Sequence, residues 1–191
     1  MRTKQWMNFL GLFVAFCLMV ANIACGSANR EKEGDEDTLP VFVNDYAKVF
    51  SASQWDETEN RLENLDLSTG NQVAVVTITE LDAYDNALEY ATAWGNTYGV
   101  GQKDKNNGVV IAVKVKNETK GEAAIAIGSG IEEILPDSTC QHIVDLEMIP
   151  HFRNNDYYSG IKAALDVVIP IVTGKKSSKD YENEIGAFKR D

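Results

Sequence analysis

The spacing of apolar residues along the chain changes between the period of a helix and the pattern of a buried strand. Helical spacing predicts helices over about 51–68, 86–98, 138–148 and 156–170, with a short one near 131–135. Continuous β-branched runs predict strands at 72–79 and 109–115, and a turn at 117–121 leads into a third strand at 122–127. This order predicts a small mixed sheet between helices, in which the first two strands are parallel and joined by a right-handed crossover.

Capping and breaking residues set the expected ends of these helices. Ser51 has the spacing of a capping box, and Asp85 is the predicted cap of the second helix, which should end at Gly99. Pro150 is predicted to end the third long helix, and Pro170 to break the last one. Before the first helix, the chain is expected to pack along the edge of the domain.

The beginning of the chain has the features of an export signal. Two basic residues precede an apolar run of 13 residues, Phe9–Ala21, which is typical of a signal-peptide core and short for a membrane span. The residues around Cys25 resemble a bacterial lipobox, although Asn22 stands where the pattern has an apolar residue. We therefore expect 1–24 to be a lipoprotein signal peptide and Cys25 to carry the lipid, with palmitate among its acyl chains. The alternative is an ordinary signal peptide cleaved near Ala24.

Composition divides the remaining chain into a tether, a domain and a tail. Residues 25–38 are small and charged, which predicts the lipidated Cys and a flexible tether, and 39–173 should form the domain. The polar segment 174–191 is expected to be disordered. We therefore expect the protein in the bacterial cell envelope, facing the periplasm or the surface. The N-terminal lipid would attach it to the membrane, and its expected partner is an envelope protein.

The charge of the chain narrows its partners. The sequence has 18 basic and 29 acidic residues, a net charge of −11, and such a surface repels nucleic acid.

Cys140 is predicted to be a buried apolar residue rather than a nucleophile. His142 and His151 lack the HExxH spacing of zinc proteases, so packing or surface roles are expected for both.

Six short motifs, in order, resemble the TPM domain family, which includes a thylakoid-lumen protein of photosystem II repair and many bacterial envelope proteins. The matching segments are Val43–Ala47, Thr69–Val76, Tyr90-Ala91 with Trp94–Gly101, Asn107–Val109, Gly128–Glu132, and Pro150–Arg153 followed by Tyr157 or Tyr158 and Gly160-Ile161. The departures are Ile131 for the usual Leu and Glu133 where Gly is common. The resemblance covers roughly 41–172 and implies a three-layer α/β/α sandwich. It also implies divalent-cation binding and, from the thylakoid member, acid phosphatase activity.

A hard cation such as Ca²⁺ is the ligand that the acidic loops suit best, because it prefers several carboxylate, amide and carbonyl oxygens. Together with the resemblance, this chemistry gives a candidate metal site made of Asp45, Asp104, Asn106, Asn107, Glu132, Glu133 and Asp137. An EF-hand loop starting at Asp104 is excluded, because Gly108 comes one position early and Val115 stands at position 12. The alternative is a solvated acidic edge in which Asn107-Gly108 forms a turn. No organic cofactor is indicated.

A metal-assisted phosphatase acting on phosphomonoesters is the alternative function, and it would need an anion-binding group. The candidates for that group are Gly128, Ser129, Gly130 and Arg153. Ser129 does not lie in a Gly-x-Ser-x-Gly elbow, so no catalytic residue is assigned. The leading hypothesis is therefore an exported, lipid-anchored, cation-binding accessory or interaction module.

Overall fold

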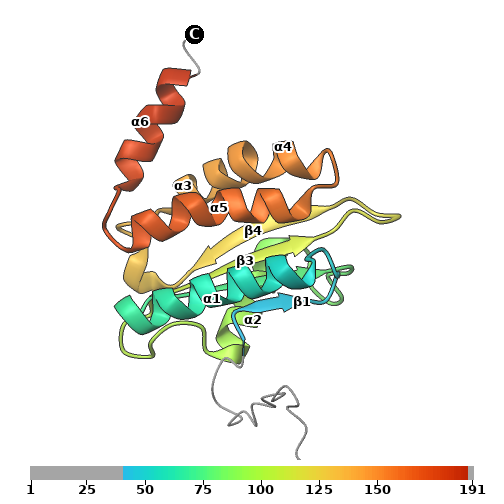
Figure 1. Ribbon diagram of the computed structural model, residues 1–191, viewed down its shortest axis with the longest axis horizontal. Coiled ribbons are helices and arrows are strands. Elements are labelled where there is room, and N and C mark those ends of the chain that lie inside the picture. Colours follow the sequence, from blue (N-terminus) through green and yellow to red (C-terminus); the bar gives the residue numbers. More distant parts are fainter. Residues whose placement is uncertain (1–40, 189–191) are drawn as a thin grey trace, which may run out of the picture. The chain divides into compact units, whose positions relative to one another are not determined.

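The computed structural model describes residues 41–188, which are built around a four-stranded mixed sheet (Figure 1). The strands, in their order across the sheet, are β1 (Val43–Asp45), β2 (Gln72–Ile78), β3 (Gly108–Lys114) and β4 (Glu122–Ile127). β1, β2 and β3 are parallel, whereas β4 is antiparallel to β3. The predicted strands and the hairpin are confirmed, and the expected edge segment contributes a short strand of its own.

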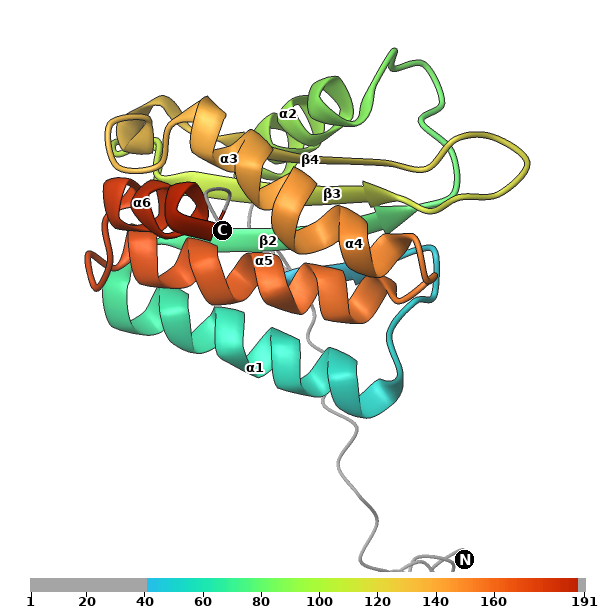
Figure 2. The same cartoon turned by 90° about the horizontal axis from the view of Figure 1, so that it is seen from above.

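Helices cover both faces of the sheet, as seen in Figures 1 and 2. One face carries α1 (Ala52–Thr69), α5 (Tyr157–Val172) and a continuous helical run of α3 (Asp137–Ile143), the π-helical turn Val144–Met148 and α4 (Ile149–Phe152). The other face carries α2 (Ala87–Tyr98). Val75 and Ile111 pack under the first group, and their neighbours Val76 and Ala112 pack under α2, because side chains alternate across a strand. The predicted three-layer α/β/α sandwich is confirmed.

The two parallel crossovers differ in hand. The units β1–α1–β2 and β2–α2–β3 step across the sheet in the same direction, yet α1 and α2 cover opposite faces. Two steps of one hand would place both helices on one face, so one crossover departs from the common right-handed form. As a result, the chain leaves the carboxyl ends of β1 and β2 toward opposite faces.

The helix caps agree with the sequence except at the start of α2. Ser51 forms the predicted capping box, and Gly70 and Gly99 end α1 and α2 in the left-handed conformation. The cap of α2 is Asn86 rather than Asp85, since the Asn86 side chain accepts a hydrogen bond from the Glu89 backbone N–H at 2.9 Å. The prediction was wrong by one residue because both side chains can cap a helix.

Two prolines that were expected to end helices lie inside helical structure instead. In the π-helical turn, the Ile149 N–H donates to the Val144 carbonyl, and Pro150 follows in the first turn of α4, where a missing N–H is tolerated. Pro170 lies two residues before the end of α5, and the buried Ile171 and Val172 continue the helix beyond it. The prediction for Pro150 was wrong, because the wider π turn keeps the chain helical, whereas α5 does end close to Pro170, at Val172.

The polar C-terminal segment is ordered where it was expected to be disordered. Residues Ser178–Phe188 form α6, and Tyr181 is only 2% exposed in the main core. The Tyr181 hydroxyl donates to Glu147 at 3.1 Å, and Glu182 accepts from Thr139 at 2.9 Å. One buried aromatic and two polar contacts therefore outweigh the polar composition of the segment.

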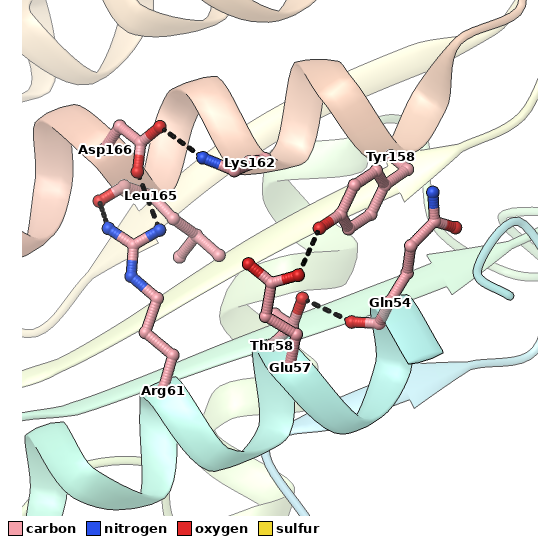
Figure 3. A network of polar contacts seen from close by, with 8 residues as sticks. All are labelled: Gln54, Glu57, Thr58, Arg61, Tyr158, Lys162, Leu165 and Asp166. Atoms are coloured by element: carbon pink, nitrogen blue, oxygen red, sulfur yellow. Dashed lines mark hydrogen bonds and ion pairs between the residues drawn. The ribbon is translucent and has the colours of Figure 1, made fainter. Parts of the chain in front are cut away.

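Side chains of α1 and α5, which lie on the same face of the sheet, form a polar network (Figure 3). Arg61 Nη1 lies 2.7 Å from Asp166 Oδ1, and Lys162 Nζ lies 3.0 Å from Asp166 Oδ2. Burial opposes the charged carboxylate, but hydrogen bonds from Lys162 and Arg61 outweigh it and lower the pKa of Asp166. The Tyr158 hydroxyl contacts Glu57 at 3.5 Å in the same layer.

The predicted signal peptide 1–24, the lipidated Cys25 and the tether up to residue 38 lie outside the described residues. Within residues 41–188, none of the helices combines the length and apolar character needed to cross a membrane.

Candidate functional site

The start of β3 and the end of β4 lie side by side, because the two strands are antiparallel. The Gly128 backbone N–H donates to the Gly108 carbonyl at 2.9 Å, and the Gly130 N–H donates to the Asn106 carbonyl at 3.0 Å. The loop before β3 and the segment after β4 are therefore in direct contact. The structure brings together these two ends of the acidic stretch.

Asp45 does not join this pair of loops. Its Cα partner in the sheet is Thr77, whereas Gly108 pairs with Gln72, five residues earlier along β2. At about 3.3 Å per residue, the two positions are about 17 Å apart along the strands. The prediction that Asp45 shares one site with Asp104 was wrong, because β1 and β3 are parallel and Asp45 ends its strand while Asp104 precedes the other.

The Asp45 carboxylate has a structural role in the turn that follows β1. Its Oδ1 accepts from the Thr77 hydroxyl at 2.5 Å and from the Val49 N–H at 3.0 Å. Its Oδ2 accepts from the Phe50 N–H at 2.9 Å. This carboxylate holds the chain in place between β1 and α1.

The loops at the start of β3 touch backbone to backbone, and three glycines make the contact possible. A Cβ on Gly108 would overlap the Val100 carbonyl. A Cβ on Gly128 or Gly130 would overlap the carbonyl of Asn106 or Lys105. Only glycine lets the segments approach this closely, so the glycine motifs of the sequence have a packing explanation.

Asn107 is buried at the centre of this loop contact, and both polar atoms of its side chain form hydrogen bonds there. Its Nδ2 donates to the Gly70 carbonyl at 2.8 Å and to Asn71 Oδ1 at 2.9 Å. Its Oδ1 accepts from the Gln102 N–H at 2.8 Å. Gln72 extends the network by accepting from the Gly101 N–H at 2.7 Å. Asn107 was predicted as a metal ligand, but these contacts make it part of the scaffold.

The predicted anion-binding group is not assembled. The N–H groups of Gly128 and Gly130 are taken by the loop before β3, and the Ile131 N–H donates to the Gly128 carbonyl at 3.1 Å. A single 3₁₀ turn, Ser129–Ile131, replaces the short helix predicted over 131–135.

Arg153 lies far from this turn, in the connection that leads into α5. The hydroxyl of Tyr157, at the start of α5, accepts from the Lys116 N–H at 2.9 Å, and Lys116 follows the carboxyl end of β3. Since Gly128 lies at the other end of β3, Arg153 and the glycine turn occupy opposite ends of the sheet.

Four of the predicted metal ligands are exposed on the two adjoining loops, namely Asp104, Asn106, Glu132 and Glu133. Asn106 has a positive φ of 47° and donates from Nδ2 to the Ser129 hydroxyl at 3.3 Å. Asp137 begins α3 and lies beside β4 instead. Within residues 41–188, no three His, Cys, Asp or Glu side chains are gathered closely enough to hold a metal ion. A cation held by these loops would therefore depend on amide, carbonyl and water oxygens as well as on carboxylates.

The hollow beside these loops is small. It has a volume of about 80 Å³ and lies between α2 and residues Asn106, Gly108 and Gly128. Sites for organic ligands usually measure roughly 300–1,000 Å³, so this hollow has room for water but not for a phosphomonoester.

Cys140 and His142 have the packing roles that were predicted for them. Cys140 is 4% exposed, and burial raises the pKa of its thiol to about 12, so the reactive thiolate is disfavoured. His142 Nδ1 lies 2.8 Å from Glu182 on α6.

A groove along the free edge of β4 was not predicted from the sequence. It has a volume of about 420 Å³ and runs between the start of α2 and α3. The run of small residues at Ala123 and Ala124 was the available signal, but it was interpreted only as part of a strand.

The fold and the glycine-closed loops together define an α/β/α domain with a mixed sheet. The family model described as the TPM domain matches residues 43–171. The chain therefore belongs to the TPM domain family, and the resemblance of the motifs is confirmed. A comparison with curated proteins gave no match.

Solved structures support the same fold. The N-terminal domain of a protein from P. gingivalis is 27% identical, with a TM-score of 0.60 over 70% of this chain and 83% of that one. The N-terminal domain of the cg2496 protein from Corynebacterium glutamicum is 17% identical, with a TM-score of 0.51 over 76% and 86%. The BA42 protein from Bizionia argentinensis is 13% identical, with a TM-score of 0.54 over 67% and 84%. The last two similarities concern the fold alone.

Proposed function

We propose that this TPM-domain protein is an exported, lipid-anchored accessory module of the cell envelope, which binds a divalent cation such as Ca²⁺ and contacts a partner protein. The observation that carries the proposal is the pair of loops at the start of β3. Their backbones are locked together, and Asp104, Glu132 and Glu133 are exposed around them. A rigid loop pair with outward-facing carboxylates suits the binding of an ion at the surface.

Binding is favoured over catalysis by what surrounds these carboxylates. Phosphomonoester hydrolysis would need donors for the phosphate and an enclosed space. The N–H groups of Gly128 and Gly130 already have carbonyl partners, and the adjacent hollow holds about 80 Å³. The phosphatase alternative therefore has less structural support than the binding module.

The donor set also predicts how tightly the cation binds. Asp104, Asn106, Glu132 and Glu133 are the side chains that would hold it, with water completing the coordination. Because Asp45 is engaged in the scaffold and Asp137 lies beside β4, only the carboxylates of Asp104, Glu132 and Glu133 remain among the predicted ligands. Calcium sites in extracellular modules have dissociation constants of about 10⁻⁴–10⁻³ M, and we expect this range here because the ligand set carries little charge.

A calcium titration followed by thermal unfolding tests the proposal. Calcium at ten times its dissociation constant should stabilise the protein by about 1.4 kcal/mol, and a chelator should reverse the effect. The variant Asp104→Asn/Glu132→Gln should lose the response. The control Asp56→Asn/Glu118→Gln removes two exposed carboxylates elsewhere and should keep it. An unchanged melting temperature at 10 mM calcium, or equal responses of both variants, would refute the cation site.

The anchor and the alternative activity have separate tests. Cys25→Ala should move the protein from the membrane fraction to the soluble fraction, and unchanged fractionation would refute the lipid anchor. Hydrolysis of p-nitrophenyl phosphate that disappears in Asp104→Asn/Glu132→Gln would favour the phosphatase instead.

A further inference from the structure

The free edge of β4 presents backbone groups without a sheet partner. β4 is the last strand in the sheet order and pairs only with β3 among residues 41–188. The Gly128 N–H donates to Gly108, which lies opposite it in the register, and bonded pairs alternate along an antiparallel ladder. The backbone N–H and C=O of Ala123 and Ile125 therefore face away from β3, and no partner for them is found within the described residues.

A groove of about 420 Å³ lies along this edge. Its floor is formed by residues 122–125 of β4, and its walls come from the start of α2 and from α3, which flank β4 on opposite faces (Figure 2). On the α2 side Leu88 is 53% exposed, and on the α3 side the wall includes Cys140 and Val144. The volume is within the roughly 300–1,000 Å³ of ligand sites.

The charge of the groove selects among occupants. Glu122 and Asp137 line it, and no Lys, Arg or His is among its described lining residues. A second copy of this chain would place the same two carboxylates on both sides of a symmetric pair, and the net charge of −11 adds repulsion. Residues 31–37 of the chain, EKEGDED, are also acidic and are disfavoured for the same reason.

We propose that this groove binds an extended, basic peptide segment of an envelope protein, which adds to β4 as a fifth strand of the sheet. The main-chain bonds would come from Ala123 and Ile125, and alternate side chains of the peptide would face the two walls. Apolar residues suit Leu88 and Val144, and Lys or Arg suits Glu122 and Asp137. This inference rests on the proposed role as an interaction module, and it depends on neither the cation site nor the lipid.

The test uses the full chain and a labelled octapeptide of alternating lysine and valine with blocked ends, measured by fluorescence anisotropy. Ala123→Pro removes an outward N–H while leaving every bond between β3 and β4 in place, which edge strands tolerate. We expect this variant to bind the peptide at least tenfold more weakly. The matched control Ala123→Val keeps the N–H and should bind within twofold of the parent chain. Equal binding by the proline and valine variants would overturn the proposal.

Charge is tested with Asp137→Asn and with a glutamate–valine octapeptide. The Asn variant should bind the lysine peptide about threefold more weakly at low salt, and the difference should fade at 0.5 M salt. Binding of the glutamate peptide as tight as that of the lysine peptide would contradict a basic occupant.

Amide hydrogen exchange supplies a site-specific readout. Addition of the lysine peptide should protect the Ala123 and Ile125 amides, whereas the Ala124 amide is already protected by β3. Protection that rises with protein concentration in the absence of peptide would show a second copy as the occupant and would overturn the proposal. The Ala123→Pro variant should keep its calcium response, so loss of peptide binding and failure of the cation site are distinguishable.

Discussion

The two ends of the sheet are both closed, but by different kinds of contact. Where β3 begins, loops meet backbone to backbone, and Gly108, Gly128 and Gly130 keep them in contact. Where β1 and β2 finish, the Asp45 carboxylate joins the Thr77 hydroxyl to the turn before α1. Asp45, an acidic residue within a family motif, therefore serves the scaffold, whereas the acids beside the glycine contact, Asp104, Glu132 and Glu133, are exposed to solvent.

The end that holds Asp45 is the natural competitor as a binding site. In open α/β sheets, ligands often bind beyond the carboxyl ends of strands, where neighbouring connections leave toward opposite faces. β1 and β2 have that arrangement, since α1 and α2 lie on opposite faces. Substitutions at each end should therefore separate a structural role from a role in binding.

The largest effect is expected where the backbones touch. Gly130→Ala places a methyl group against the Lys105 carbonyl, and neither backbone can move without breaking the loop contact. We therefore expect the free energy of unfolding to fall by about 3 kcal/mol or more. Urea unfolding measures the change. Gly186→Ala in α6 is the matched control, because its Cβ meets nothing within 4 Å, and it should stabilise by about 0.5–1 kcal/mol. Equal stabilities of the two variants would show that the glycine contact is not needed.

A smaller loss is expected at the opposite end. Asp45→Ala removes three hydrogen bonds to a carboxylate, from Thr77, Val49 and Phe50, and should destabilise the protein by about 2 kcal/mol. The same variant should retain the full calcium response of the parent chain. A variant that folds well but no longer responds to calcium would restore Asp45 as a ligand.

The sequence predicted the strands well and the site only in part. Continuous β-branched runs and the capping box at Ser51 are local signals, and the structure follows them. The place of Asp45 depends on the register between β1 and β2, which is a long-range property that no local pattern records. The order of α6 likewise depends on one buried residue, Tyr181, within a polar segment.

The smallest change in stability is expected in the polar network between α1 and α5. Because this network lies at neither end of the sheet, it is a reference for the losses of stability expected at both ends. Asp166 is half exposed, so Asp166→Asn should cost less than about 1 kcal/mol at pH 7. Its hydrogen bonds lower the folded pKa below the unfolded value of about 3.9. The contribution is therefore present above about pH 4 and is lost as the pH falls through the folded pKa. Urea unfolding of both proteins at pH 7 and pH 2.5 should show the difference shrinking in acid, and a difference that grows would contradict this sign.

Calcium titration of the isotope-labelled protein, followed by amide chemical shifts, distinguishes the two ends of the sheet as calcium sites. We expect the amide signals of residues 104–108 and 128–133 to shift in a saturable way, with a dissociation constant of about 10⁻⁴–10⁻³ M, while the chemical shifts of residues 45–50 and 77–82 do not change. Shifts centred on Asp45 and Thr77, with the glycine loops unchanged, would contradict this expectation.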